Sequence, residues 1–235
     1  MKDLNKAMLE EELYLKDKFN GKETSLQARL MQYGYTTLKE YFDAKKAYLF
    51  NNWKPEVYFI PIEDFAEKVE NAIQASEYGI YIPVAKGLHA YHGTDEIDYA
   101  QCEQDGIRVI ELNYTGGTII GNEDDFSIEI VAPANIGLDF NCIINKFYEI
   151  ISKYEDNVTI DGNDILINGN KVLGSMTRRI NNTFVWAAQA TFGDHVDAIN
   201  KICKKKSAKA PGRIKSNYLT RDKLQNEVIS WLRKS

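Results

Sequence analysis

The residue most suited to chemistry in this chain is a lysine beside a predicted β-hairpin. Lys171 follows an Asn168-Gly169 pair closely. Asn-Gly supplies the positive φ angles of a type I′ turn, so strands are expected at 164–167 and 170–173. A lysine fixed there, next to Gly174-Ser175, presents a cation to a phosphate or carboxyl oxygen. The competing interpretation is a solvated hairpin lysine, since lysine is seldom buried.

A glycine pair is the second candidate feature. Gly116-Gly117 follows a predicted strand and precedes Thr118. Without a Cβ, such residues let the backbone pass close to a ligand, although glycine pairs are also ordinary turns. The chain has no GxxxxGK[ST] phosphate loop, and no GxGxxG opens a helix. The common nucleotide-binding fingerprints are therefore excluded.

The other polar clusters are less specific. Arg178-Arg179 suits a bidentate grip on an anion, or it is a polar strand end. The run 121–125 collects three carboxylates without the EF-hand spacing, so an acidic loop competes with a cation site. The three histidines and three cysteines show no HExxH, CxxC or triad-like spacing. This pattern speaks against a zinc centre or a cysteine nucleophile.

The elements that must position these residues alternate between strands and helices. Apolar or alternating runs predict further strands at 57–62, 80–84, 88–91, 108–110, 126–131 and 184–192, with 80–84 and 88–91 joined by the connection 85–87. Helical spacing predicts helices at 63–78, 95–104, 139–154, 195–204 and 220–234. Strand 126–131 alternates apolar and polar residues, which predicts one solvated face. The pattern indicates an α+β fold with a mixed or antiparallel sheet flanked by helices.

Residues 1–54 differ from the rest of the chain. No proline precedes Pro55, apolar residues recur at helical spacing, and Thr37 with Glu40 resembles a capping box. We therefore expect an all-helical appendage over 1–54, without a chemical motif, and a main domain over 55–235.

Composition and charge restrict the class of protein. Hydrophobic residues make up 44% of the chain and charged residues 27%, as in ordinary globular proteins, so disorder is excluded as the default state. Residues 55–200 carry 24 acidic and 8 basic side chains, whereas 201–235 carry 11 basic and 2 acidic ones. This basic tail suggests a phosphate-bearing partner, docking on the acidic body, or only a solvated helix face. Nucleic acid is the weakest partner candidate, because no aromatic residue lies between Lys201 and Ser216 to stack bases.

The cellular location is predicted from the apolar segments and the cysteines of the sequence. No run of about 18 apolar residues is present, and the first residues show no apolar signal segment. The cysteines are widely spaced and odd in number, which suits reduced thiols. We expect a cytoplasmic protein without a membrane partner.

Several segments, in order, resemble the lipoate/octanoate–protein ligase branch of the biotin/lipoate protein ligase superfamily. Residues 93–109 resemble the stretch before that family's glycine-rich loop, and 111–122 fall where the family has RRxSGGGAVYHD. Residues 161–176, DGNDILINGNKVLGSM, are similar to its GRNDLxxxGRKxSGSA, with the hairpin and the lysine in register. Residues 212–217 look like the basic segment before its last helix. The resemblance covers about residues 57–235 and implies a divergent member with that fold.

The resemblance also implies an activity. Members of this family activate a carboxylic acid as an acyl-adenylate, using ATP and Mg²⁺, and pass the acyl group to a lysine of an acceptor protein; some act as acyltransferases. Lys171 takes the place of the family's catalytic lysine, which holds the carbonyl and phosphate oxygens. The implied substrate- and nucleotide-binding positions are Gly116, Gly117, Thr118, Asn163, Asp164, Gly174, Ser175 and Arg178, with Asp164 also as the metal ligand.

The chain departs from the family pattern at its glycine-rich loop. The paired arginines of the family are Glu111-Leu112 here, and its His-Asp is Gly121-Asn122. A carboxylate repels an adenylate where a guanidinium attracts it, and Arg178 or Arg179 is a candidate replacement. Two interpretations stay open. The Lys171 hairpin favours a ligase-like enzyme, whereas the altered loop favours a binding or structural protein on the same fold.

Overall fold

The chain divides into two compact units, and the first holds three helices. The computed structural model describes residues 2–21, 25–94, 96–134, 136, 138, 140–195, 197–204 and 209–234. The three helices are α1 (Leu4–Phe19), α2 (Leu26–Met31) and α3 (Leu38–Asn52), packed around Ala7, Leu30, Tyr35 and Tyr41. Helix α3 begins at Thr37, whose hydroxyl accepts from the Glu40 amide at 3.1 Å, as the capping box predicts. The expected division into a 1–54 appendage and a 55–235 domain stays a prediction.

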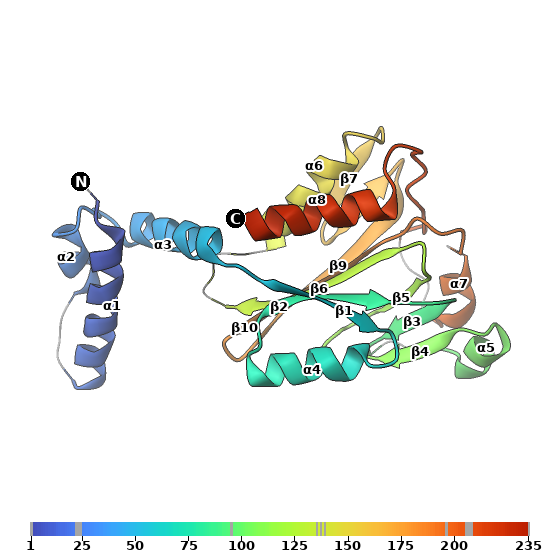
Figure 1. Ribbon diagram of the computed structural model, residues 1–235, viewed down its shortest axis with the longest axis horizontal. Coiled ribbons are helices and arrows are strands. Elements are labelled where there is room, and N and C mark those ends of the chain that lie inside the picture. The colour runs from blue at the N-terminus through green and yellow to red at the C-terminus, as the bar shows by residue number, and fades with distance from the viewer. Residues whose placement is uncertain are drawn as a thin grey trace. The chain divides into compact units, whose positions relative to one another are not determined.

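The second unit contains a large mixed sheet (Figure 1). Its strands lie in the order β1 (Glu56–Pro61), β2 (Gly79–Val84), β6 (Phe126–Pro133), β10 (Thr183–Ala190), β9 (Asn170–Ile180), β8 (Asp164–Ile167) and β7 (Val158–Asp161). Strands β1 and β2 pair in parallel, and the remaining neighbours are antiparallel. The predicted α+β fold with a mixed sheet is confirmed.

A small sheet lies beside the large one. It consists of β4 (Arg108–Glu111), β3 (His89–His92) and β5 (Thr118–Gly121), with β3 parallel to β4 and antiparallel to β5. Strands β5 and β7 were not predicted, since each is only four residues long. The segments at 80–84 and 88–91 are both strands, as predicted, but the connection between them carries the chain from one sheet to the other.

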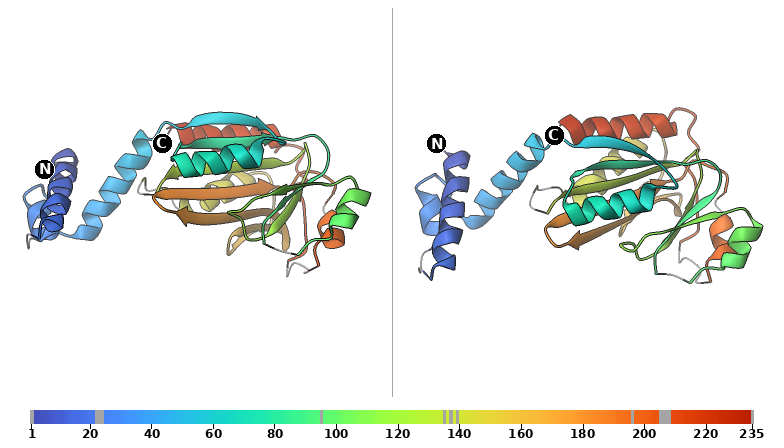
Figure 2. Two further views of the ribbon diagram at one scale, coloured as in Figure 1. Left: turned by 90° about the horizontal axis from the view of Figure 1, so that it is seen from below. Right: turned by 60° about the horizontal axis from the view of Figure 1, so that its bottom comes forward.

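Helices cover both faces of the large sheet (Figures 1 and 2). Helices α6 (Phe140–Ile151) and α8 (Arg221–Lys234) contact each other on one face, and α4 (Phe65–Ala75) packs on the other. On the first face, the Phe147 ring packs 6.1 Å from that of Phe126 and 5.5 Å from that of Trp186. The short helices α5 (Tyr99–Gln104) and α7 (Ala198–Ile202) contact each other and flank the small sheet. In the described residues, no helix is long and apolar enough to cross a membrane.

Strand β6 corrects one prediction. Its alternation predicted a solvated face that would carry Glu129, but Glu129 is only 5% exposed. The reason is tertiary, because the small sheet and α4 cover the face that the sequence pattern assigns to solvent. A glutamate therefore lies inside the molecule.

The hairpin between β8 and β9 agrees with its prediction. Asn168 and Gly169 have φ angles of 50° and 78°, as a type I′ turn requires. The second strand of the hairpin is longer than expected and continues to Ile180, where a second turn leads directly into β10. Lys171 therefore lies on a strand of the large sheet and not at an isolated turn.

This turn makes a testable prediction about stability. Alanine at Gly169 is strained at a φ of 78°, although no atom lies within 4 Å of its added Cβ. We expect Gly169→Ala to lower the free energy of unfolding by about 1–2 kcal/mol. Gly116→Ala is the matched control, since that position has equally open space and no positive φ. Urea denaturation measures both; equal stability of the two variants would contradict the assigned turn.

Candidate functional site

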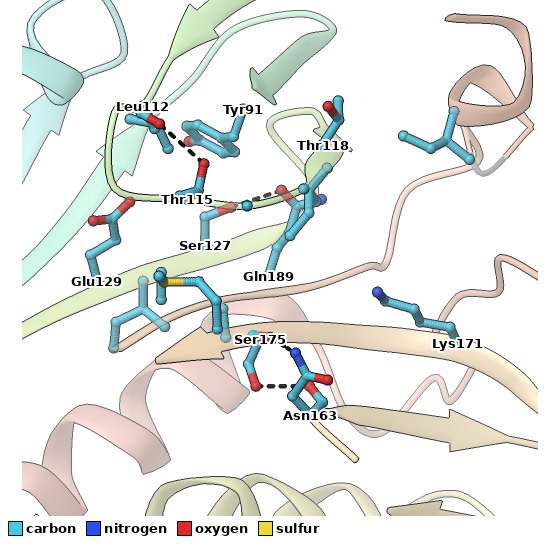
Figure 3. Close-up of a pocket in the computed structure, with 18 of the residues that line it drawn as sticks. Tyr91, Leu112, Thr115, Thr118, Ser127, Glu129, Asn163, Lys171, Ser175 and Gln189 are labelled. Atoms are coloured by element: carbon cyan, nitrogen blue, oxygen red, sulfur yellow. Dashed lines mark hydrogen bonds between the residues drawn. The ribbon is translucent and has the colours of Figure 1, made fainter. Parts of the chain in front are cut away.

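A cavity of about 630 Å³ lies between the small sheet and the strands β6, β9 and β10 (Figure 3). Apolar side chains, among them Phe65, Leu112, Ile119 and Met176, form much of its wall. A second cavity of about 120 Å³ adjoins the first and shares Lys171 with it. A concave, largely apolar site with a few convergent polar groups is the usual form of a small-molecule site.

Lys171 lies where the two cavities meet. Its backbone amide donates to Ala210 O, and its carbonyl accepts from Gly212 N, both at 2.8 Å. Its ammonium Nζ is 2.9 Å from Asp164 Oδ1. The backbone of residues 210–212 thus holds the strand on one side, while Asp164 aims the side chain.

Gly174 leaves the room that the Lys171 side chain occupies. A Cβ at Gly174 would lie 2.7 Å from Lys171 Cε and 2.9 Å from its Nζ, closer than real Cβ atoms approach. Next to it, two hydrogen bonds join Ser175 and Asn163. The Ser175 hydroxyl donates to Asn163 O at 2.8 Å, and the side-chain Nδ2 of Asn163 donates to Ser175 O at 2.5 Å. These predicted site residues are therefore brought together around the lysine.

Asp164 holds a second cation besides Lys171. The Lys209 ammonium lies 2.7 Å from Asp164 Oδ2 and 3.1 Å from Asp161 Oδ2. Burial alone would lower the pKa of Lys209, but its hydrogen bonds to these two carboxylates outweigh burial and raise it. Lys209 was not predicted as a site residue, because only the fold brings the basic tail to the hairpin.

The metal role predicted for Asp164 stays a prediction. Each of its carboxylate oxygens faces a lysine ammonium, Lys171 or Lys209. Among the residues that the structure describes, no group of three or more His, Cys, Asp or Glu side chains is placed to hold a metal ion. Both carboxylate oxygens of Asp164 are therefore paired with lysine ammonium groups in this structure.

The glycine pair lies in the loop between β4 and β5 and lines the larger cavity. The Thr94 hydroxyl donates to Gly116 O at 2.8 Å, and the Gly93 amide donates to Gly117 O at 3.1 Å. Thr118 follows at the start of β5, with its hydroxyl 3.1 Å from His92 Nδ1. The loop thus lines the larger cavity, and hydrogen bonds with residues 92–94 hold it in place.

Arg178 is not brought to this site. It lies in the exposed part of β9, beyond Met176, and lines neither cavity. Glu111, which stands at the position of a family arginine, is also exposed and accepts from the Tyr99 hydroxyl at 2.7 Å. Leu112 is buried instead and lines the larger cavity. The second cation at Asp164, besides Lys171, is Lys209 and not one of the arginines 178–179.

Glu129 was not predicted as part of the site, and it faces the larger cavity. The Tyr114 hydroxyl donates to Glu129 Oε2 at 2.5 Å. Burial raises the pKa of Glu129 to about 8. Glu129 stands between Ile128 and Ile130, and this apolar setting is the sequence signal that could have singled it out.

Asp125 explains the acidic loop without a bound cation. Its Oδ1 accepts from the amides of Phe192 and Gly193, at 2.8 Å and 3.0 Å. Its Oδ2 lies 2.9 Å from His195 Nε2 and 3.3 Å from Gln189 Nε2. Burial alone would lower the pKa of His195, but the hydrogen bond and charge of Asp125 outweigh burial and raise it.

Comparison with known proteins identifies the fold. No protein-family model matches the sequence, and no curated protein matches it significantly. Among solved structures, P. falciparum LipL1 in complex with lipoate is similar over 74% of this chain and 59% of its own, with 14% identity and a TM-score of 0.61. A lipoate-protein ligase A bound with ATP is similar over 76% of this chain and 83% of its own, with 14% identity and a TM-score of 0.58.

A third structure gives the same result. The bi-partite lipoate protein ligase of Thermoplasma acidophilum is similar over 76% of this chain and 82% of its own, with 14% identity and a TM-score of 0.57. The chain therefore has the fold of lipoate–protein ligases, and the resemblance stated from the sequence is confirmed at that level. It spans 59% of the length of LipL1.

The buried carboxyl of Glu129 makes a prediction about pH. The unfolded chain ionises this carboxyl near its ordinary pKa of 4.5, whereas the folded chain does so only near 8. Stability therefore falls as pH rises between these values, by a few kcal/mol at most. Glu129→Gln keeps an acceptor for Tyr114 but removes the carboxyl that titrates. We expect this variant to lose the pH dependence that Glu129 causes, and to be more stable than the wild type at pH 8 but not at pH 4.5.

Urea denaturation at half-unit pH intervals measures the effect. The exposed Glu103 provides the control variant Glu103→Gln, which should follow the wild type. A constant difference between wild type and Glu129→Gln across the range would contradict the raised pKa.

Proposed function

We propose that this protein is a ligase-like enzyme that activates a small carboxylic acid with ATP and transfers the acyl group to a lysine of an acceptor protein. The observation that carries the proposal is the position of Lys171 at the meeting point of two cavities. The larger cavity suits the body of an acid, and the smaller one, which Lys209 also lines, suits phosphate oxygens.

The chemistry needs a cation at this point. A carboxylate oxygen of the acid attacks the α-phosphorus of ATP and displaces pyrophosphate, which gives the mixed anhydride. The amine of the acceptor lysine then attacks the acyl carbon, loses a proton, and AMP leaves. Negative charge develops on the phosphoryl oxygens in the first step and on the carbonyl oxygen in the second. A cation held in place beforehand stabilises both.

Asp164 and Gly174 support this role for Lys171. The carboxylate holds the ammonium at 2.9 Å, and the missing Cβ lets the side chain cross the strand. A fixed charge costs less reorganisation during the reaction than a free lysine side chain does. Asn163 and Ser175, locked to each other, keep this part of the wall rigid.

The solved structures of the same fold support the choice of reactants. LipL1 was solved with lipoate and the lipoate-protein ligase A with ATP, and the Thermoplasma ligase was studied with its E2 lipoyl domain. For the present chain we propose, by analogy, ATP, a small carboxylic acid and a lysine-bearing acceptor. Mg²⁺ and the metal role of Asp164 are part of the same proposal.

A second candidate is a protein that binds an acid without activating it. Glu111 favours it, because an exposed carboxylate stands where the family pattern that the sequence resembles has an arginine. Lys209 argues the other way, since it brings a second cation to Asp164 from another part of the chain. We prefer the enzyme because two lysines converge on the smaller cavity.

The test is exchange of radiolabelled pyrophosphate into ATP, dependent on added acid. Octanoic, lipoic and other acids are supplied one at a time, and binding of each acid is measured separately by calorimetry. Acid-dependent exchange supports the enzyme. Binding of an acid without any exchange would favour the binding protein, and absence of both would overturn the proposal.

Lys171→Ala should lower acid-dependent pyrophosphate exchange by roughly 10²–10³-fold, because the charge that stabilises the reacting oxygens is lost. The fold should survive, since Asp164 keeps Lys209 as its partner. Lys153→Ala, which removes an exposed lysine paired with Glu149, is the matched control and should leave exchange unchanged. Full exchange activity in Lys171→Ala would show that the site is wrongly assigned.

Gly174→Ala tests the position of the cation and not its presence. The new Cβ displaces the flexible end of Lys171, so activity should fall at least about tenfold while the melting temperature changes little. The measurements are the same exchange assay and a thermal melt. An unchanged rate would mean that the observed path of the Lys171 side chain is not needed.

A further inference from the structure

The larger cavity has a polar side away from Lys171. Figure 3 shows Tyr91, Thr115 and Glu129 on the side of the cavity opposite to the lysine. An acid whose carboxylate lies at Lys171 would therefore direct its other end toward these side chains. The chemistry of that polar side restricts what this end of the ligand can be.

Glu129 acts there as a hydrogen-bond donor. Burial raises its pKa to about 8, so the carboxyl is protonated at neutral pH. The structure shows no ion pair between Glu129 and a lysine or arginine of the described chain, and Tyr114 occupies its Oε2. The titratable groups that face it are Tyr114, Tyr91 and, from α4, Glu70, none of which is a cation. A proton on the other oxygen is then available to a ligand.

The Tyr91 hydroxyl is a second polar group on this side. Tyr91 is only 7% exposed and lines the cavity. The Ser127 side chain lies beside its hydroxyl, but no described residue meets that hydroxyl with the geometry of a hydrogen bond. Leaving a buried hydroxyl unsatisfied costs about 1–3 kcal/mol, which a ligand oxygen would recover. A donor in this position, beside a protonated carboxyl, points to an acceptor in the ligand.

We propose that the acid bound in this cavity carries a neutral, hydrogen-bond-accepting group, such as an amide carbonyl, at the end opposite its carboxylate, where Glu129 and Tyr91 hold it. This inference rests on the proposed function, because it requires the carboxylate at Lys171. It goes further by naming the class of acid. A plain alkyl end would leave the Tyr91 hydroxyl and the proton of Glu129 without an acceptor, whereas a carbonyl oxygen can accept from them.

A charged end is excluded by the same surroundings. A second carboxylate would face Glu129 and, beyond it, Glu70, with no cation on this side to compensate. The described wall on this side contains hydroxyls, one carboxyl and apolar groups. The ligand end is therefore polar and uncharged.

The experiment compares two series of acids by calorimetry with the full chain at pH 6.5. One series is the straight-chain acids of six to ten carbons, and the other is the same chains ending in a primary amide. We expect the best amide-ended acid to bind at least about tenfold more tightly than the alkyl acid of equal length. An equal or lower affinity for the amide series would overturn the inference.

Three variants locate the preference. Tyr91→Phe and Glu129→Met each remove one donor and should bring the ratio of affinities toward one. Glu129→Gln keeps a donor and should keep the preference, now without the loss that the wild type shows above about pH 8. Tyr218→Phe, at an exposed tyrosine, is the matched control. A ratio that stays the same in both Tyr91→Phe and Glu129→Met would overturn the assignment.

Lys171→Ala separates this inference from the proposed function. If alkyl and amide acids bind equally in the wild type and both are lost in Lys171→Ala, the inference fails and the carboxylate site stands. If no acid of either series binds to the wild type, the proposed function fails and the inference fails with it.

Discussion

The cavity depends on one buried carboxylate. Asp125 accepts backbone hydrogen bonds from Phe192 and Gly193 and lies beside His195, which fixes the segment that follows β10. Gln189 of the large sheet donates to Ile120 O of the small sheet at 2.5 Å. Leaving the Asp125 carboxylate buried without its hydrogen-bond partners would cost several kcal/mol. Together with the bond from Gln189, these contacts hold the two sheets in one relative position. The space between them is the candidate site.

Within that frame, the two sides of the cavity carry opposite kinds of polarity. At one side, Asp164 offsets two lysines, so an incoming anion meets positive charge that is already held in place. At the other side, burial raises the pKa of Glu129 to about 8, while its Oε2 still accepts from the Tyr114 hydroxyl. The proposed acid would therefore be oriented by its charge at the first side and by hydrogen bonding at the second.

Much of the fold followed from local patterns, because a turn such as Asn168-Gly169 and the apolar faces of α6 and α8 are specified within a few residues. The lysine and the glycine pair that the sequence singled out line the larger cavity. Glu129 and Lys209 could not be found in this way. The burial of Glu129 depends on a second layer of structure, and the role of Lys209 depends on a tail that returns to the hairpin.

The structure changes the interpretation of the substitutions in the glycine-rich loop. In the sequence, Glu111 suggests a lost anion site, because it carries the wrong charge. In the structure its side chain is exposed and bonded to Tyr99, whereas the cations lie at the far side of the cavity on β9 and the tail. Electrostatic attraction depends on distance and burial and not on alignment position. A change of charge at Glu111 therefore decides less about function than the convergence of Lys171 and Lys209 on Asp164.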